Sequence, residues 1–166
     1  MGRTAVISAI LIPADEETPI SLIDIDGLRD MQRAVGGLIE VMDIDRPDAT
    51  LVINEEGKLI SLPMNRRATL ACWTHLSRWR GMDALLGDVI IVGRPNDDGD
   101  TTSVPDELVN LFFHTETYRI EVTTISDPDT WSGNQRRFTD VWEAYNAGQV
   151  LAHKWALVDD VRVVPA

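Results

Sequence analysis

The apolar segments of this sequence are short, rich in Val and Ile, and gathered in clusters rather than alternating regularly with helical segments. Segments of this kind, bounded by Gly, Pro, Asn and Asp, are typical of strands. Strict strand–helix alternation, which would indicate a doubly wound fold, is absent, so the sequence predicts an α+β protein with a mixed or antiparallel sheet and three to four helices. The expected strands are Thr4–Pro13, Ile20–Ile25, Leu38–Ile44, Ala49–Asn54, Lys58–Leu62, Asp88–Gly93, Tyr118–Ile125, Val150–Val158 and Val161–Val164.

Four helices are expected from caps and periodicity. They run from Asp26 to Val35, from Arg66 to Arg80, from about Ser103 to Phe113, and from Phe138 to Ala147. The helix that begins at Arg66 is predicted to bury Ala68, Cys72, Leu76 and Trp79, with His75 beside them. Its opposite face would carry Arg66, Arg67, Leu70, Thr74, Ser77 and Arg78, with Trp73 at the margin.

The polar segment Arg94–Thr102 is the best candidate for a linker in a chain of 166 residues. It predicts an α+β domain over residues 1–95 and an α/β extension over residues 104–166, packed as one globular unit.

Acidic residues outnumber basic ones by 27 to 15, which gives a net charge of −12 with neutral histidines. This charge repels phosphate backbones, disfavours direct nucleic-acid binding and favours basic partners, although solubility alone would also explain it. The single cysteine, Cys72, suits a reducing compartment, and the apolar run Ala5–Pro13 is too short to span a bilayer. We therefore expect a cytoplasmic protein without a membrane span; association with further copies of the chain stays open.

Four stretches between Leu28 and Phe112 carry a resemblance: Leu28–Glu40, Val52–Lys58, Leu62–Thr69 and Leu86–Gly93. They resemble the domain of unknown function 3846 family, whose members are similar to proteins of phages, plasmids and other mobile elements of bacteria. The matching residues form turns and caps rather than a catalytic signature. The resemblance implies a genomic setting in which small acidic proteins often disable a host factor or capture a defence signal.

One basic stretch interrupts the acidic sequence. No acid lies between Glu56 and Asp83, whereas five bases do, two of them in the first turn of the expected helix. Asn65, Arg66 and Arg67 there are candidates for binding a small phosphorylated ligand such as a signalling nucleotide, because free helix amides and arginines both bind anions. The alternatives are pairing with neighbouring acids and a protein interface.

Catalytic, metal and cofactor signatures are weak. Asp127 and Asp129 match only the first two positions of a calcium loop, and Phe138 stands where the closing Glu is needed. Cys72 and His75 lack a third orienting group. The sequence therefore predicts no catalytic residue, no metal, no cofactor and no enzymatic activity.

The remaining candidates belong to a protein-binding surface. Trp131 in the expected loop Asp127–Asn134, with Leu70 and Trp73, would supply apolar anchors, and Asp97, Asp98 and Asp100 would steer a basic partner. The leading hypothesis is a non-enzymatic phage or mobile-element accessory protein that binds and inhibits a host factor in counter-defence or host takeover. The alternative is sequestration of the phosphorylated ligand.

Overall fold

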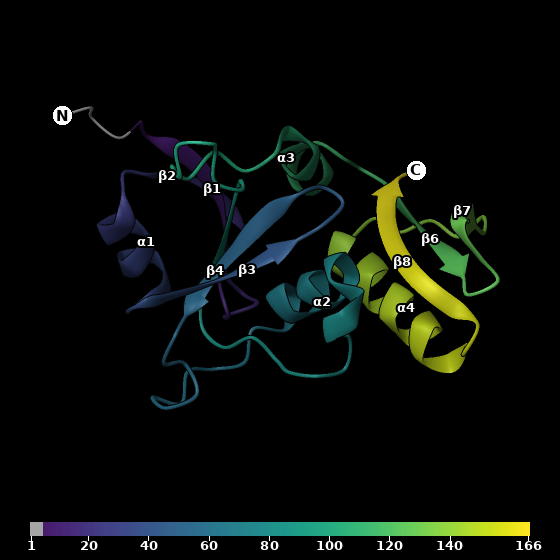
Figure 1. Cartoon of the computed structure of the whole chain (residues 1–166). Coiled ribbons are helices and arrows are strands. Elements are labelled where there is room, and N and C mark those ends of the chain that lie inside the picture. The colour runs from purple at the N-terminus through teal and green to yellow at the C-terminus, as the bar shows by residue number, and fades with distance from the viewer. Residues whose placement is uncertain (1–4) are drawn as a thin grey trace. The chain divides into compact units, whose positions relative to one another are not determined.

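The computed structural model describes residues 5–166, which form four α-helices, one 3₁₀ helix and two antiparallel sheets (Figure 1). The predicted α+β class is confirmed. The chain divides into two compact units. The first comprises Met1–Thr69 with Asp83–Asp106, and the second comprises Leu70–Met82 with Glu107–Ala166. Residues 70–82 thus belong to the same unit as the C-terminal residues, whereas the division expected from the sequence places them in the N-terminal domain, residues 1–95.

A five-stranded sheet forms the first unit, in the order β2-β1-β5-β4-β3. Its strands are β1 (Ile7–Ile12), β2 (Ser21–Ile25), β3 (Ile39–Ile44), β4 (Ala49–Asn54) and β5 (Val89–Val92). All neighbouring strands are antiparallel. The central strand β5 is buried at every position, which explains its uninterrupted Val and Ile sequence. Thr4, the first residue of the predicted N-terminal strand, lies outside the described residues.

Helix α1 (Leu28–Val35) covers one face of this sheet. Its buried residues Met31 and Val35 pack with Ala9, Val52 and Ile90 in one core cluster. The helix ends at Gly36, whose φ of 80° is the left-handed conformation that glycine tolerates best. The N-cap is Gly27 rather than the predicted Asp26.

The predicted strand Lys58–Leu62 is wrong, because this segment forms a compact turn. Its amides bond locally: Leu62 N–H donates to the Gly57 carbonyl at 2.9 Å, and Ile60 N–H donates to the Glu56 carbonyl at 3.1 Å. Local bonds of this kind remove the donors that a strand ladder would need.

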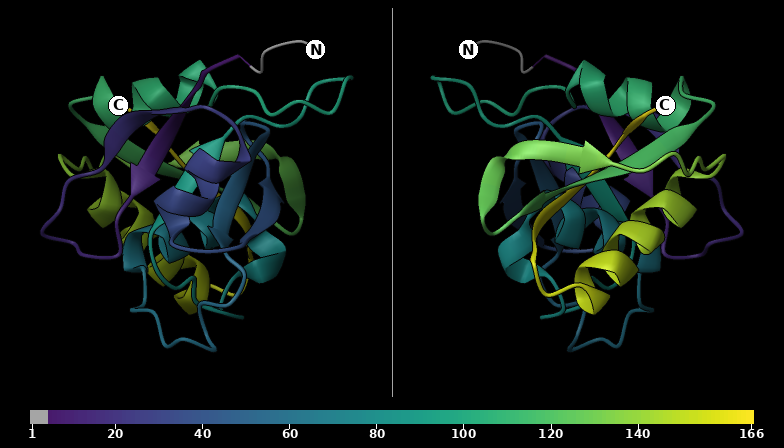
Figure 2. Two further views of the ribbon diagram at one scale, coloured as in Figure 1. Left: turned by 90° about the vertical axis from the view of Figure 1, so that its left-hand side faces the viewer. Right: turned by 90° about the vertical axis from the view of Figure 1, so that its right-hand side faces the viewer.

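A three-stranded sheet with the order β7-β6-β8 forms the second unit, together with helix α4 (Val141–Lys154). The strands are β6 (Tyr118–Thr124), β7 (Asp127–Gly133) and β8 (Val158–Pro165). Helix α4 packs against β8 and β6 (Figure 2). Helix α3 (Asp106–Phe113) carries Phe112, whose ring lies 5.3 Å from that of Trp142.

Two predictions in the second unit need correction. The expected loop Asp127–Asn134 contains strand β7, whose residues are mostly exposed and therefore show no apolar alternation. The expected strand Val150–Val158 is divided instead: α4 continues to Lys154, and β8 begins at Val158. Leu151 and Ala152 pack on the sheet from the helix, so their apolar character reflects a helical stripe.

Helix α2 (Arg66–His75) is shorter than predicted. Leu76 leaves the helical conformation (φ −146°, ψ 76°), and a 3₁₀ helix, η1 (Ser77–Trp79), follows it. Arg66 and Arg78 are exposed as predicted. The prediction is wrong for Arg67, Leu70 and Thr74, which are all buried. Thr74 satisfies its hydroxyl inside the helix by donating to the Leu70 carbonyl at 2.8 Å.

Candidate binding surfaces

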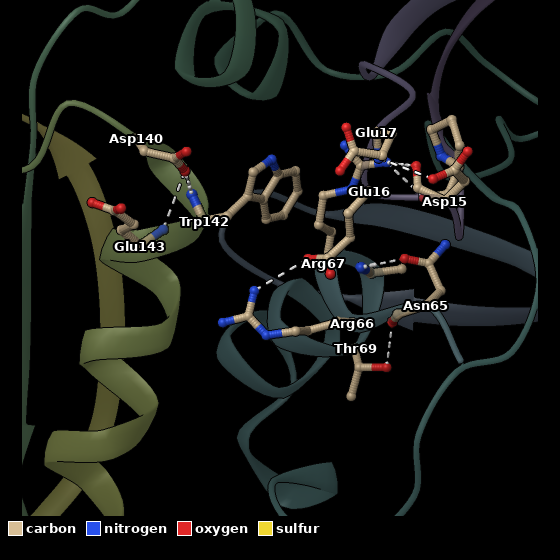
Figure 3. Close-up of polar contacts among 12 residues, drawn as sticks. Asp15, Glu16, Glu17, Asn65, Arg66, Arg67, Thr69, Asp140, Trp142 and Glu143 are labelled. Carbon is tan, nitrogen blue, oxygen red and sulfur yellow. Dashed lines mark hydrogen bonds and ion pairs between the residues drawn. The ribbon is translucent and has the colours of Figure 1, made fainter. Parts of the chain in front are cut away.

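Asn65 caps the beginning of α2 (Figure 3) and fastens it to β1 and to the chain before β5. Its side chain is fully buried. The amide nitrogen Nδ2 donates to the carbonyls of Ile12 (2.8 Å) and Gly87 (2.9 Å), and Oδ1 accepts from the Ala68 N–H (3.0 Å). Every one of these bonds stays within the protein, so Asn65 serves as a helix cap and a structural brace.

The two arginines of the predicted anion site have different surroundings. Arg67 is buried, and its Nη2 donates to the carbonyls of Pro13 (2.7 Å), Thr18 (2.9 Å) and Asp15 (3.1 Å). Arg66 is exposed, and its Nη1 lies 3.3 Å from Oε1 of Glu16 (Figure 3). The guanidinium of Arg67 thus holds the loop between β1 and β2, and Arg66 is the arginine of this pair that faces solvent.

The predicted steering acids lie on a loop with an internal framework. Oδ1 of Asn96 accepts the N–H groups of Asp98 and Asp100, each at 3.0 Å. The Asn96 N–H donates to the Asp100 carbonyl at 2.9 Å, and Gly99 takes a φ of 83°, which glycine allows without strain. Asp97, Asp98 and Asp100 are exposed, and none of them forms an ion pair with a residue that the structure describes. This acidic loop, residues 94–102, extends away from the strands of its unit (Figure 2).

A pocket of about 230 Å³ lies beside the acidic loop, within the first unit. Three segments form it: the end of β2 with the start of α1, the chain before and at the start of β1, and the loop itself. Its lining residues are Ala5, Ile7, Ile25, Gly27, Leu28, Met31, Gly99, Asp100 and Thr101. The pocket combines mostly apolar lining residues with one acidic residue, Asp100.

The negative charge belongs almost entirely to the first unit. Residues 1–69 and 83–106 contain 18 acids and eight bases, a net charge of −10, whereas the second unit contains nine acids and seven bases, a net charge of −2. Asp97, Asp98 and Asp100 therefore lie on the strongly acidic unit.

The three predicted apolar anchors belong to the second unit. Leu70 is only 7% exposed, and Trp73 is half-buried. Trp131 lies on β7 rather than on a loop, and the guanidinium of Arg162 covers its ring at 4.3 Å from the centroid. Arg162 is itself fixed by Glu121, at 2.7 Å between Nη2 and Oε1. Because of these contacts, the ring of Trp131 is less accessible to a partner protein than the ring of a tryptophan on an exposed loop would be.

The buried groups of the second unit include Cys72, His75 and Tyr145. Burial raises the pKa of the Cys72 thiol to about 11, which disfavours the thiolate. Within residues 5–166, no three His, Cys, Asp or Glu side chains are placed to hold a metal ion. Over the same residues, no helix has the length and apolar character needed to cross a membrane.

The sequence does not predict two features of the surface. The pocket requires three segments that are distant in the chain, and no local pattern indicates their convergence. The turn after β4 exposes Leu59 (84%) and Ile60 (53%), whereas the apolar run directly after Asn54-Glu-Glu-Gly57 predicts a strand.

Comparison with known proteins gives one result. The family model described as a domain of unknown function (DUF3846) matches residues 7–117, which is more than half of the chain. No curated protein and no solved structure matches the chain. The matched residues include the whole five-stranded sheet, helix α1 and the acidic loop. On this match, the chain belongs to the DUF3846 family.

Proposed function

We propose that this protein is a non-enzymatic binding protein that captures and inhibits a basic host protein in the bacterial cytoplasm, with the acidic first unit as its recognition surface. The observation that carries the proposal is the net charge of −10 on that unit, combined with three exposed carboxylates that have no ion-pair partner among residues 5–166. Charge of one sign on a surface accelerates the approach of an oppositely charged partner.

The framework of the acidic loop supports the same role. Because Asn96 already binds the backbone of Asp98 and Asp100, the loop does not have to be ordered when a partner arrives. Ordering a flexible segment costs free energy on binding, so a loop formed in advance favours association.

The choice of a host protein as the partner comes from the family resemblance to proteins of mobile elements. An acidic protein of such an element would find basic partners among the host proteins that hold nucleic acid. Binding to that basic surface would block the access of the nucleic acid and thereby inhibit the host factor.

A pull-down from bacterial lysate at low and at high salt identifies the partner, and surface plasmon resonance then measures its association rate. The test variant carries Asp97→Lys, Asp98→Lys and Asp100→Lys, and the matched control carries Glu116→Lys, Asp127→Lys and Asp129→Lys, three exposed acids of the second unit. We expect the loop variant to slow association about tenfold or more and to flatten its salt dependence. The control changes net charge equally and should alter the rate much less.

Equal effects of the two triple variants would contradict a role of the acidic loop. Loss of the partner's own activity on addition of the wild-type protein, and its retention with the loop variant, tests inhibition separately from binding.

A further inference from the structure

The pocket beside the acidic loop is lined by apolar residues from the strands and α1 and by polar residues from the loop. Ile25 and Met31, at 2% and 9% exposed, are buried members of the core cluster, and Ile7 packs against that cluster. Leu28, at the first position of α1, is 52% exposed. Asp100 and its neighbours Gly99 and Thr101 complete the lining.

We propose that this pocket receives a single lysine or arginine side chain displayed by the partner, an inference that rests on the proposed function and specifies how the partner is held. Lysine and arginine combine an apolar stem with a cationic end, and they place the stem along apolar surface while the charge stays near water or an acid. The apolar walls match the stem, and the carboxylate of Asp100 matches the cation.

Further acids adjoin the pocket lining in the sequence and add negative charge to this region. Asp26 and Asp98 each directly neighbour a lining residue, both are exposed, and neither forms an ion pair with a described residue. Asp24 precedes Ile25 on β2 and therefore points to the other face of the sheet. Asp30 is already engaged, since it accepts from the Asp26 N–H at 2.7 Å and pairs with Arg33 at 3.1 Å. One basic residue, Arg29, directly follows the lining residue Leu28 in the sequence and is exposed on α1.

Alternative occupants fit less well. A phosphate or carboxylate group would meet Asp100 and the surrounding acids, and like charges at close range repel. A purely apolar side chain would fill the walls but would remove water from the Asp100 carboxylate without replacing its interactions, which costs free energy. A long side chain with a positive end satisfies both parts of the pocket.

The test is a titration of the full ¹⁵N-labelled chain followed by NMR chemical shifts. The probes are the N-acetyl, N-methylamide derivatives of lysine, arginine, norleucine and glutamate. Norleucine keeps the apolar stem of lysine without its charge. We expect the lysine and arginine derivatives to shift the amides of residues 25–31 and 99–101 with millimolar affinity. The norleucine derivative should bind several-fold more weakly, and the glutamate derivative should leave these amides unchanged.

Asp100→Asn tests the charge in the pocket lining, and Glu40→Gln, at an exposed position on β3, is the matched control. The first variant should reduce the affinity for the lysine derivative several-fold, toward that of norleucine, and the second should leave it unchanged. An unperturbed amide spectrum away from residue 100 shows that the variant is folded. Equal affinity of wild-type protein for lysine and norleucine, shifts centred elsewhere, or no shift at all would overturn the assignment.

Failure of this inference is distinguishable from failure of the proposed function. If a basic host protein is captured and the loop charges control its association, but no cationic derivative shifts the pocket amides, the pocket assignment is wrong and the proposed function stands. If the derivatives bind in the pocket but no basic protein is captured, the proposed function fails and the pocket remains a site for a cationic side chain.

Discussion

Nε2 of His75 lies 2.6 Å from the hydroxyl oxygen of Tyr145, and both side chains are buried in the second unit. Burial raises the pKa of the Tyr145 hydroxyl, and nearby Tyr118 and Glu107 act in the same direction, so this hydroxyl stays protonated. The Tyr145 ring also lies 5.7 Å from the ring of Trp142. This hydrogen bond joins α2 and α4 within an aromatic cluster, and a second one, from Gln149 Nε2 to Thr74 Oγ1 at 2.9 Å, joins the same two helices.

Tyr145→Phe should remove this bond while keeping the ring contacts. A polar atom left without its partner in a buried site costs about 1–3 kcal/mol, so we expect the free energy of unfolding to fall by that amount. Urea denaturation measures it. Tyr118→Phe is the control. The buried Tyr118 hydroxyl donates to the carbonyl of Thr115, which is only half-buried and can bond water instead, so its loss should cost less. Equal losses in the two variants would contradict the importance of the His75–Tyr145 bond.

Arg67→Met should loosen the loop between β1 and β2. The substitution keeps an apolar stem but removes the donor for the carbonyls of Pro13, Asp15 and Thr18. We expect faster amide hydrogen exchange over residues 14–18 and a loss of about 2–3 kcal/mol of stability. Arg66→Met removes only an exposed ion pair with Glu16 and should cost less than about 1 kcal/mol. Unchanged exchange in the Arg67 variant would show that the loop is held by other contacts.

Elements with strong local signals could be predicted from the sequence. The bounds of β4, Ala49–Asn54, agree with the prediction because a β-branched run is closed by a turn sequence. Helix α1 ends at Val35 as predicted, since the following glycine supplies the left-handed C-cap. The prediction of a strand over residues 150–154 is wrong because Val150 and Leu151 suit a strand and a helix equally, and only the packing of Leu151 on the sheet of the second unit distinguishes the two.

The candidate site shows the same limit. Arg66 and Arg67 are adjacent and chemically identical, yet one faces solvent and the other is buried among backbone carbonyls. Only the position of the β1–β2 loop distinguishes them. Exposure of Asp97, Asp98 and Asp100 agrees with the polar, turn-forming sequence around them, whereas the adjoining pocket depends on Ile7 and Met31, which no local pattern connects.

Cys72 makes stability depend on pH in the alkaline range. Its pKa rises from 9.0 to about 11 because of burial, so the folded state keeps the thiol protonated where the unfolded state ionises. The stabilisation is therefore fully present below pH 9 and is lost as the pH rises toward 11, by about 3 kcal/mol for two pKa units. Urea denaturation at pH 8 and pH 10.5 should show a larger loss for the wild-type protein than for Cys72→Ala. Equal losses would contradict burial of the thiol.

Gly148 permits the close packing of α4 on β8. A Cβ atom at this position would lie 2.7 Å from Cγ1 of Val161, closer than side chains approach one another. Gly→Ala within a helix normally stabilises by about 1 kcal/mol, but here we expect Gly148→Ala to destabilise. Ala147→Gly, one position earlier, should also destabilise, by about 1 kcal/mol through helix propensity. Thermal denaturation of both variants checks the signs, and a stabilised Gly148 variant would contradict the close contact.

Asn96 determines whether the acidic loop is ordered before binding. Asn96→Ala removes the acceptor of the Asp98 and Asp100 amides without changing any charge. We expect ¹⁵N order parameters of residues 97–101 to fall from the rigid range, about 0.85, toward values below about 0.6. Because Gly99 keeps its conformational freedom, the loosened loop samples many arrangements, and the carboxylates no longer hold a fixed geometry beside the pocket. Asn134→Ala, which removes a comparable bond to the Arg136 amide, is the control and should leave residues 97–101 rigid. If the order parameters of the Asn96 variant equal those of the wild-type protein, the side chain of Asn96 does not organise the loop, and the rigidity on which steering and pocket shape depend has another origin.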